Sequence, residues 1–133
     1  MNILLWVLQF LLAVFVTSTG IIHFVLPPNL PAPLQWMYDL SPPLHAVSGA
    51  AELLAAAGLI LPGLTRMHTR LTPLAASGLV LVMLGAIVFH ISRGELLNAI
   101  LNLVVAALAA FVVYGRWRIS PLSDGVFKPG HQT

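Results

Sequence analysis

The sequence predicts an all-α membrane protein whose four transmembrane helices form an antiparallel up-down bundle. Apolar residues make up 59% of the 133 residues, and charged residues make up only 8%. Four apolar stretches each reach or approach the roughly 20 residues that a helix needs to cross about 30 Å of hydrocarbon. Helix is the expected structure, because lipid offers no partners to backbone polar groups and the stretches lack a strand-like alternation. The four predicted spans are residues 3–26, 44–61, 71–91 and 96–114.

The first span is expected to end at Pro27-Pro28, because proline cannot continue a helix. The following segment, residues 27–43, carries six prolines and the cluster Trp36-Met37-Tyr38. Trp and Tyr favour the headgroup level, which predicts a loop on the membrane surface with one short helical turn. The second span is rich in Gly and Ala, and such residues let membrane helices approach closely. We therefore expect it to be the most closely packed member of the bundle.

The third span is predicted to begin near Thr72-Pro73, since proline suits the first turn of a helix. The short connection from Ser92 to Glu95 makes the third and fourth spans antiparallel neighbours. Residues 1–119 are thus expected to form one four-helix transmembrane domain. Residues 120–133, with Pro, Gly, Ser and Asp, are expected to form a poorly ordered cytoplasmic tail.

The distribution of basic residues predicts the orientation in the membrane. Only Arg93 lies in the set of loops that contains the 92–95 connection. The excess of basic residues on the other side places both termini in the cytoplasm by the positive-inside rule. The residues on that side are Arg66, Arg70, Arg116, Arg118 and Lys128.

Composition also excludes several functions. Six basic residues in 133 are too few for nucleic-acid binding, and the orientation explains their placement. The chain contains no cysteine, which removes disulfides, thiol redox chemistry, iron–sulfur ligation and c-type haem attachment within it.

Glu52 is the most unusual residue of the spans, because it lies in the middle of the apolar run 43–61. An ionised carboxylate is costly in hydrocarbon, so at this depth it normally faces the bundle interior and has a partner or a task. Helical spacing places His45 on the same stripe, about 10 Å nearer the outer boundary. We expect Glu52 to lie at the bottom of a polar pocket and His45 to lie above it.

The other spans bring polar residues to the same outer half of the bundle. Asn98 and Asn102 form a stripe that descends from the outer boundary on the fourth span, and His23 and His90 lie near the outer ends of the first and third. The inner half is drier, with Gln9 as the one strongly polar side chain of the first span there. This asymmetry favours a pocket that opens outward or sideways into the outer leaflet over a continuous pore.

Two interpretations of these residues stay open. Glu52 can serve a function, or it can be a protonated carboxyl that joins helices through Asn98 or Asn102. Each histidine is also explained by its closeness to the interface, where imidazole is tolerated. Thr19 and its neighbouring hydroxyls are expected to bond only to their own helix backbone.

Short motifs along the chain have a recognisable order and spacing. They are Gly20-Ile21-Ile22-His23, Ser48–Leu53 with its G-x-x-E pattern, Gly58–Pro62, Ala75-Ala76, and Met83–His90 with its A-x-x-x-H pattern. In this arrangement they resemble the DoxX-like family of small four-span membrane proteins, over about residues 5–116. Many members carry a basic residue where this chain has His23, so an ion pair of that position with Glu52 is not carried over.

The resemblance implies a multi-pass protein of the bacterial inner membrane. Some relatives are linked to quinone-dependent thiosulfate oxidation or to oxidative-stress complexes, whereas related proteins in animals act as cargo receptors or assembly factors. We therefore expect an accessory subunit of a membrane oxidoreductase system with a quinone-binding pocket in the outer half of the bundle. It is not expected to be a stand-alone enzyme, because the chain offers no electron source and needs a partner protein.

The main alternative is a non-catalytic membrane assembly factor, scaffold or small-molecule receptor. A b-type haem between histidines is less favoured, because these residues lie near the interface of a very small bundle, and no metal site is expected. A transporter is disfavoured by the dry inner half and by the lack of broken-helix repeats. The expected partners are the bilayer and a partner oxidoreductase or other membrane protein, and a homo-oligomer is a further candidate.

Overall fold

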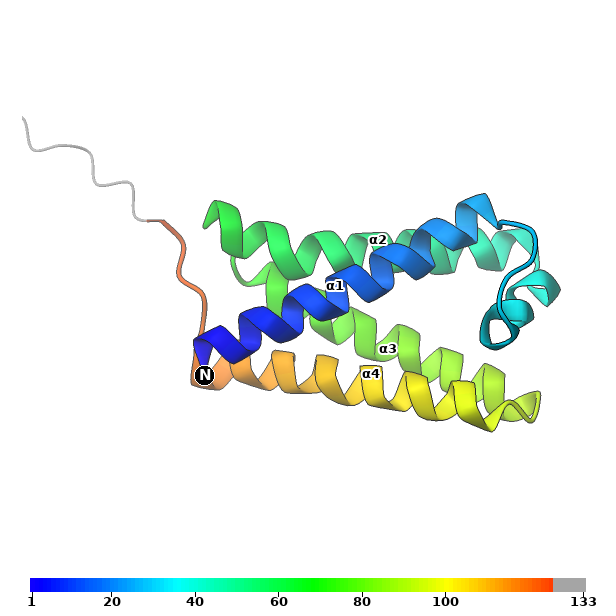
Figure 1. Ribbon diagram of the computed structural model, residues 1–133. Helices are drawn as coiled ribbons and strands as arrows, with labels where there is room; N and C mark the ends of the chain where they lie inside the picture. The colour runs from blue at the N-terminus through cyan, green and yellow to red at the C-terminus, as the bar shows by residue number, and fades with distance from the viewer. Residues whose placement is uncertain (126–133) are drawn as a thin grey trace, which may run out of the picture.

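The computed structural model describes residues 1–125, and four long helices account for most of them (Figure 1). Each apolar stretch is long and apolar enough to cross a membrane, and the fourth extends to Ile119. The prediction of an all-α membrane bundle of four helices is therefore confirmed. The elements are α1 (Asn2–Val25), the 3-10 helix η1 (Ala32–Asp39), α2 (Pro42–Thr65), α3 (Leu71–Ser92), α4 (Leu96–Tyr114) and the π-helical turn η2 (Gly115–Ile119).

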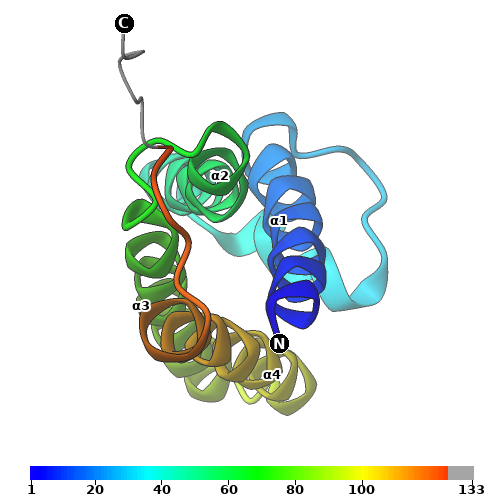
Figure 2. The ribbon, with the colours of Figure 1, turned by 90° about the vertical axis from the view of Figure 1, so that its left-hand side faces the viewer.

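Successive helices run in opposite directions, so the bundle has two distinct ends (Figure 1). The start of α1, the α2–α3 connection and η2 lie at one end, which we call the terminal end. η1 and the α3–α4 connection lie at the other, which we call the η1 end. α1 and α4 are near each other at the terminal end and diverge toward the η1 end, as both views show (Figures 1 and 2).

Small residues set the crossings between neighbouring helices. A Cβ added at Gly49 of α2 would lie 2.9 Å from His23 Cβ and 3.1 Å from the Gly20 carbonyl oxygen, both on α1. A Cβ added at Gly58 of α2 would collide with the Cβ of Ala75 on α3. α2 therefore packs tightly against a neighbour on each side, through the close approach that small residues permit in membranes.

The core is apolar and the outer surface is apolar as well, as expected for helices in lipid. Leu59, Leu79 and Val112 are fully buried where the helices meet. Large side chains such as Leu54 and Leu81 are exposed on the outside of the bundle. A bundle that is apolar on both sides is buried in hydrocarbon and not in water.

The segment after α1 folds back over the η1 end. Leu26 adopts a left-handed conformation with φ of 39°, which ends α1 immediately before Pro27. The Tyr38 hydroxyl donates to the Pro27 carbonyl at 2.7 Å and accepts from the Leu30 N–H at 2.9 Å. Met37 is only 1% exposed, so η1 inserts a side chain between the helices as well as lying across their ends.

The terminal end contains a hydrogen-bond network that sequence reasoning missed. Arg116, expected to follow the fourth span, is only 2% exposed within η2. Its Nε donates to Gln9 Oε1 at 2.5 Å, and its Nη1 donates to Asn2 Oδ1 at 2.6 Å. Gln9 Nε2 in turn donates to the Leu59 carbonyl at 2.6 Å. The π-helical turn explains the difference, because it continues the fourth helical run and brings the guanidinium against α1.

The described part of the tail, residues 120–125, runs along the α2–α3 connection. The Thr69 N–H donates to Asp124 Oδ1 at 2.8 Å, and the Gly125 N–H donates to the Arg66 carbonyl at 2.9 Å. Lys128 and His131 lie outside the described residues, together with the rest of the predicted tail.

Candidate functional site

A cavity of about 230 Å³ lies in the half of the bundle near the η1 end. All four long helices and η1 contribute to its lining. Three apolar lining residues, Phe15 of α1 and Leu101 and Val104 of α4, are also exposed on the outer surface. The cavity therefore opens toward lipid between α1 and α4, where these helices diverge. Its polar and indole side chains are Thr19, Trp36, Glu52, His90, Asn98 and Asn102.

Glu52 reaches the cavity from α2 and is only 6% exposed. The Thr19 hydroxyl of α1 donates to Glu52 Oε2 at 2.7 Å, so the carboxyl joins α1 to α2. Thr19 is thus a site residue that the sequence analysis had assigned to its own helix backbone. Among residues 1–125, Glu52 Oε1 has no hydrogen-bond partner, which leaves one carboxyl oxygen available to an occupant of the cavity.

Asn98 and Asn102 lie one helical turn apart on α4, half-buried, and both line the cavity. Neither side-chain amide is hydrogen-bonded to another of the described residues. Each amide carries two N–H donors and one carbonyl acceptor. Unpaired amides are costly away from water, so this pair is chemically suited to a polar group in the cavity.

His23 and His45 do not line the cavity but bond to each other beside it. Their Nδ1 atoms are 2.9 Å apart, so one ring carries the proton and donates it to the other. Both side chains are buried, and the two nitrogens leave no space between them for a haem iron. The alignment of His45 directly above Glu52 on one stripe therefore did not bring the two side chains into one pocket.

Trp36 of η1 separates this histidine pair from His90. Its ring meets the His23 ring edge-on at 6.1 Å and the His90 ring at 4.7 Å between centroids. Trp36 also lines the cavity, so η1 supplies an aromatic surface to the site. Sequence reasoning placed this residue at the membrane interface, because nothing in the local sequence shows that the loop folds back over the helices.

His90 is held by a chain of charged groups at the η1 end. Its Nδ1 lies 2.6 Å from Glu95 Oε2, while Arg93 donates to Glu95 Oε1 at 2.9 Å and to Asp39 Oδ2 at 2.7 Å. The hydrogen bond from His90, and then the Arg93 guanidinium, hold the pKa of Glu95 below its usual value. The bonds to Asp39 and Glu95 raise the pKa of Arg93. With Nδ1 engaged, Nε2 of His90 is the ring nitrogen left for other partners.

Within residues 1–125, no group of three or more His, Asp or Glu side chains is arranged to hold a metal ion. The cavity instead combines one carboxyl, two amides, an imidazole and an indole with apolar walls. Pockets with apolar walls and a few polar groups are typical of small-molecule binding sites.

The four apolar helices and the polar cavity in one half of the bundle define a small multi-pass membrane protein. The model of the DoxX-like family matches residues 7–112, and the chain belongs to this family. The matched range includes every cavity residue named above. No curated protein and no solved structure matches the chain.

Proposed function

We propose that this protein is an accessory membrane subunit of an oxidoreductase system and that its cavity holds the ring of a quinone. The observation that carries the proposal is the pair of cavity amides, Asn98 and Asn102, that lack partners among the described residues. Membership of the DoxX-like family favours the bacterial inner membrane, and the five basic residues on one side favour both termini in the cytoplasm. The cavity then lies in the outer half of the bilayer.

The lining suits both redox states of such a ring. Quinone carbonyls only accept hydrogen bonds, and the Asn98 and Asn102 amides can donate them. The hydroxyls of the quinol donate, and Glu52 Oε1 or an amide oxygen can accept. The volume of about 230 Å³ is small for a drug-sized ligand but suits one ring. The opening between Phe15 and Leu101 would let an isoprenoid tail remain among the lipid chains.

Reduction of a quinone consumes two electrons and two protons. Glu52 and His90 are the cavity side chains whose carboxyl and imidazole groups are of the kind that acts in general acid–base catalysis. The chain has no cysteine and supplies no thiol or iron–sulfur route for the electrons. The electrons therefore come from a partner oxidoreductase, and this chain contributes the binding site.

Quinone binding can be measured through Trp36, one of three tryptophans in the chain. With Trp6 and Trp117 replaced by Phe, a short-chain quinone added to the protein in nanodiscs should quench Trp36 fluorescence saturably. Replacing Asn98 and Asn102 together by Leu should weaken binding about tenfold, because each lost hydrogen bond contributes roughly 0.5–1.5 kcal/mol.

Two matched controls separate the site from general effects. Leu103→Ala changes an exposed α4 residue outside the cavity and should leave quenching unchanged. Ser18→Ala removes a hydroxyl that bonds only to Val14 of its own helix, whereas Thr19→Val removes the Glu52 partner and should weaken binding. Quenching that is linear in quinone concentration, or equal in all variants, would refute a quinone site.

The non-catalytic alternative differs in what the partner does. Co-purification from native membranes should recover an oxidoreductase, and the reconstituted pair should reduce bound quinone. Glu52→Gln should slow this reaction if the carboxyl carries a proton. Saturable binding without any partner-dependent reduction would instead identify a small-molecule receptor or assembly factor.

A further inference from the structure

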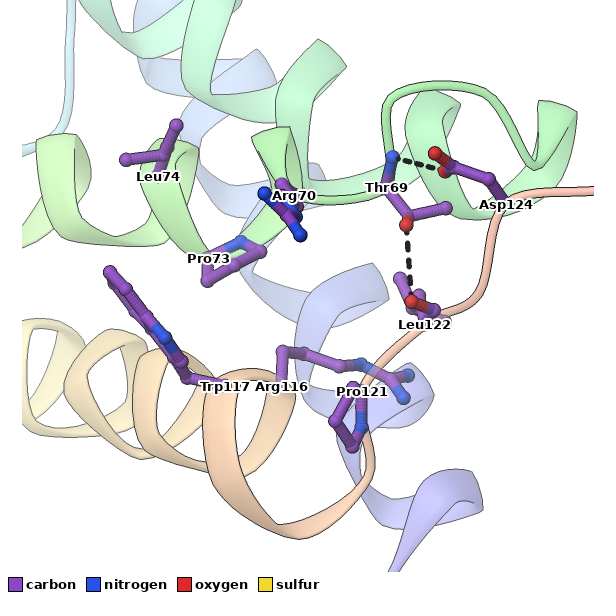
Figure 3. Close-up of a pocket in the computed structure, with 9 residues that line it drawn as sticks. All are labelled: Thr69, Arg70, Pro73, Leu74, Arg116, Trp117, Pro121, Leu122 and Asp124. Carbon is purple, nitrogen blue, oxygen red and sulfur yellow. Dashed lines mark hydrogen bonds between the residues drawn. The ribbon is translucent and has the colours of Figure 1, made fainter.

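A second cavity, of about 790 Å³, lies at the terminal end (Figure 3), whereas the candidate quinone site lies near the η1 end. Arg70 at the start of α3 and Arg116 of η2 lie on facing walls, and Trp117 closes one side. Asp124 contributes the one carboxylate of the lining, and it accepts a hydrogen bond from the Thr69 N–H. Hydrogen bonding to Thr69 is the main cause that lowers the pKa of Asp124, and nearby positive charges contribute less.

An apolar groove of about 610 Å³ lies next to this cavity, on the lipid-facing side of α3 and α4. Trp117 lines both spaces, so the groove and the cavity are neighbours that meet at this side chain. α3 contributes Val80 and Leu81 to the groove lining. α4 contributes Ala110, Val113 and Tyr114. Arg118 lies at the groove end that is nearest the cavity.

The π-helical turn η2 creates this combination. Arg116 turns inward and is buried, while Trp117 and Arg118 are exposed. The described residues that bond Arg116 supply only uncharged oxygens: the side chains of Gln9 and Asn2 and the carbonyl of Ser120.

Positive charge at the cavity is therefore only partly offset, because Asp124 is the one carboxylate that lines it beside Arg70 and Arg116. Arg116 Nη2 is buried and has no hydrogen-bond partner among the described residues. Within residues 1–125, neither Arg70 nor Arg118 forms an ion pair with a carboxylate. A buried cation without a carboxylate favours an anion nearby, since its charge is only weakly screened.

We propose that the terminal end carries a specific site for an anionic phospholipid, with the phosphate in the cavity lined by Arg70 and Arg116 and an acyl chain in the α3–α4 groove that Arg118 lines. The excess of arginine over carboxylate selects an anionic headgroup. The groove selects a lipid over a free phosphate, because it is apolar and faces the bilayer. Trp117 marks the headgroup level at which the two parts meet.

Brominated lipids provide the test, because bromine on the acyl chain quenches a nearby tryptophan. The full chain with Trp6 and Trp36 replaced by Phe reports on Trp117 alone. In mixed vesicles, brominated phosphatidylglycerol should bind beside Trp117 several times more strongly than brominated phosphatidylcholine. In the protein that retains only Trp36, at the η1 end, the two brominated lipids should quench Trp36 fluorescence equally.

Charge variants distinguish a specific lipid site from a general attraction of anionic lipids to basic loops. Arg70→Gln and Arg118→Gln should each lower the preference for phosphatidylglycerol about fivefold. Arg66→Gln removes the same charge from the same end but outside both spaces, and should leave the preference largely intact. An equal loss in all three variants, or an equal lipid preference at Trp36 and Trp117, would overturn the site.

The groove is tested without changing charge. Ala110→Phe should fill the groove and reduce phosphatidylglycerol binding beside Trp117, whereas Ala107→Phe, exposed on α4 but outside the groove, should not. Inorganic phosphate in excess should fail to displace the lipid. Displacement by phosphate, or equal effects of the two Phe variants, would show a headgroup-only anion site and overturn the lipid assignment.

Discussion

The α1–α2 crossing depends on the absence of a side chain at Gly49. An added Cβ would lie 2.7 Å from Phe24 Cε2, 2.9 Å from His23 Cβ and 3.1 Å from the Gly20 oxygen. The Phe24 ring end can move, but the other two atoms belong to, or are attached directly to, the α1 backbone. Ordinary contact begins at 3.4 Å, so α1 would have to move away by 3.4 minus 2.9, or 0.5 Å, to restore an ordinary contact between the new Cβ and His23 Cβ in Gly49→Ala.

The cost of this movement can be isolated with a second variant. Gly78→Ala, within α3, adds the same methyl group where nothing lies within 4 Å. Both substitutions gain roughly 0.5–1 kcal/mol from the lower conformational freedom of Ala, so this gain cancels in the comparison. We expect Gly49→Ala to be less stable than Gly78→Ala by about 1–3 kcal/mol, the usual cost of overpacking.

The free energy of unfolding can be measured by SDS titration in mixed micelles, with helicity followed by circular dichroism. The close crossing also positions Thr19 against Glu52, so Gly49→Ala should weaken quinone quenching while Gly78→Ala should not. Equal unfolding free energies for the two variants would refute the assigned role of Gly49 at the crossing.

Three further changes test other parts of the bundle. Gly58→Ala should destabilise the protein, and Ala75→Gly in the same chain should restore stability, because the double variant again has one methyl at the contact, now on α2 instead of α3. SDS titration of the single and double variants measures this coupling. Gln9→Leu should cost about 1.5–3 kcal/mol in the same assay, because it removes an acceptor from the buried guanidinium, and adding Arg116→Met should recover part of the loss. The lowered pKa of Glu95 means that its stabilising contribution is complete above its ordinary value of 4.5 and is lost as the pH falls through the lower folded value. Melting temperatures measured between pH 6 and 3 should show this loss of stability. In Glu95→Gln the melting temperature should fall less over the same pH range.

The helices and their order could be predicted because each depends on a local property of the sequence. A run of about 20 apolar residues predicts a span, and Pro27-Pro28 or Ser92–Glu95 predict where spans end. The depth of Glu52 follows from its position within one helix. These predictions need no knowledge of how one helix is rotated against another.

The composition of the site could be predicted only in part, because it depends on such rotations. The Gly20–Gly49 crossing sets which face of α1 meets α2, and it brings Thr19 to Glu52. The same packing pairs His23 with His45 outside the cavity. These contacts join residues that are far apart in the sequence, so the periodicity within a single helix cannot predict them.

Access to the η1-end cavity from between α1 and α4 has a consequence for affinity. The quinone that we propose for this cavity would enter from the bilayer, so the relevant concentration is that of quinone dissolved in lipid. A compound that partitions a thousandfold into lipid gains roughly 4 kcal/mol of apparent affinity before it makes any contact with the protein. For the proposed quinone, weak hydrogen bonds from Asn98 and Asn102 would then suffice for occupancy, and water-soluble analogues of the same ring would bind poorly. Ligand choice at this site is shared between the protein and the membrane that surrounds it.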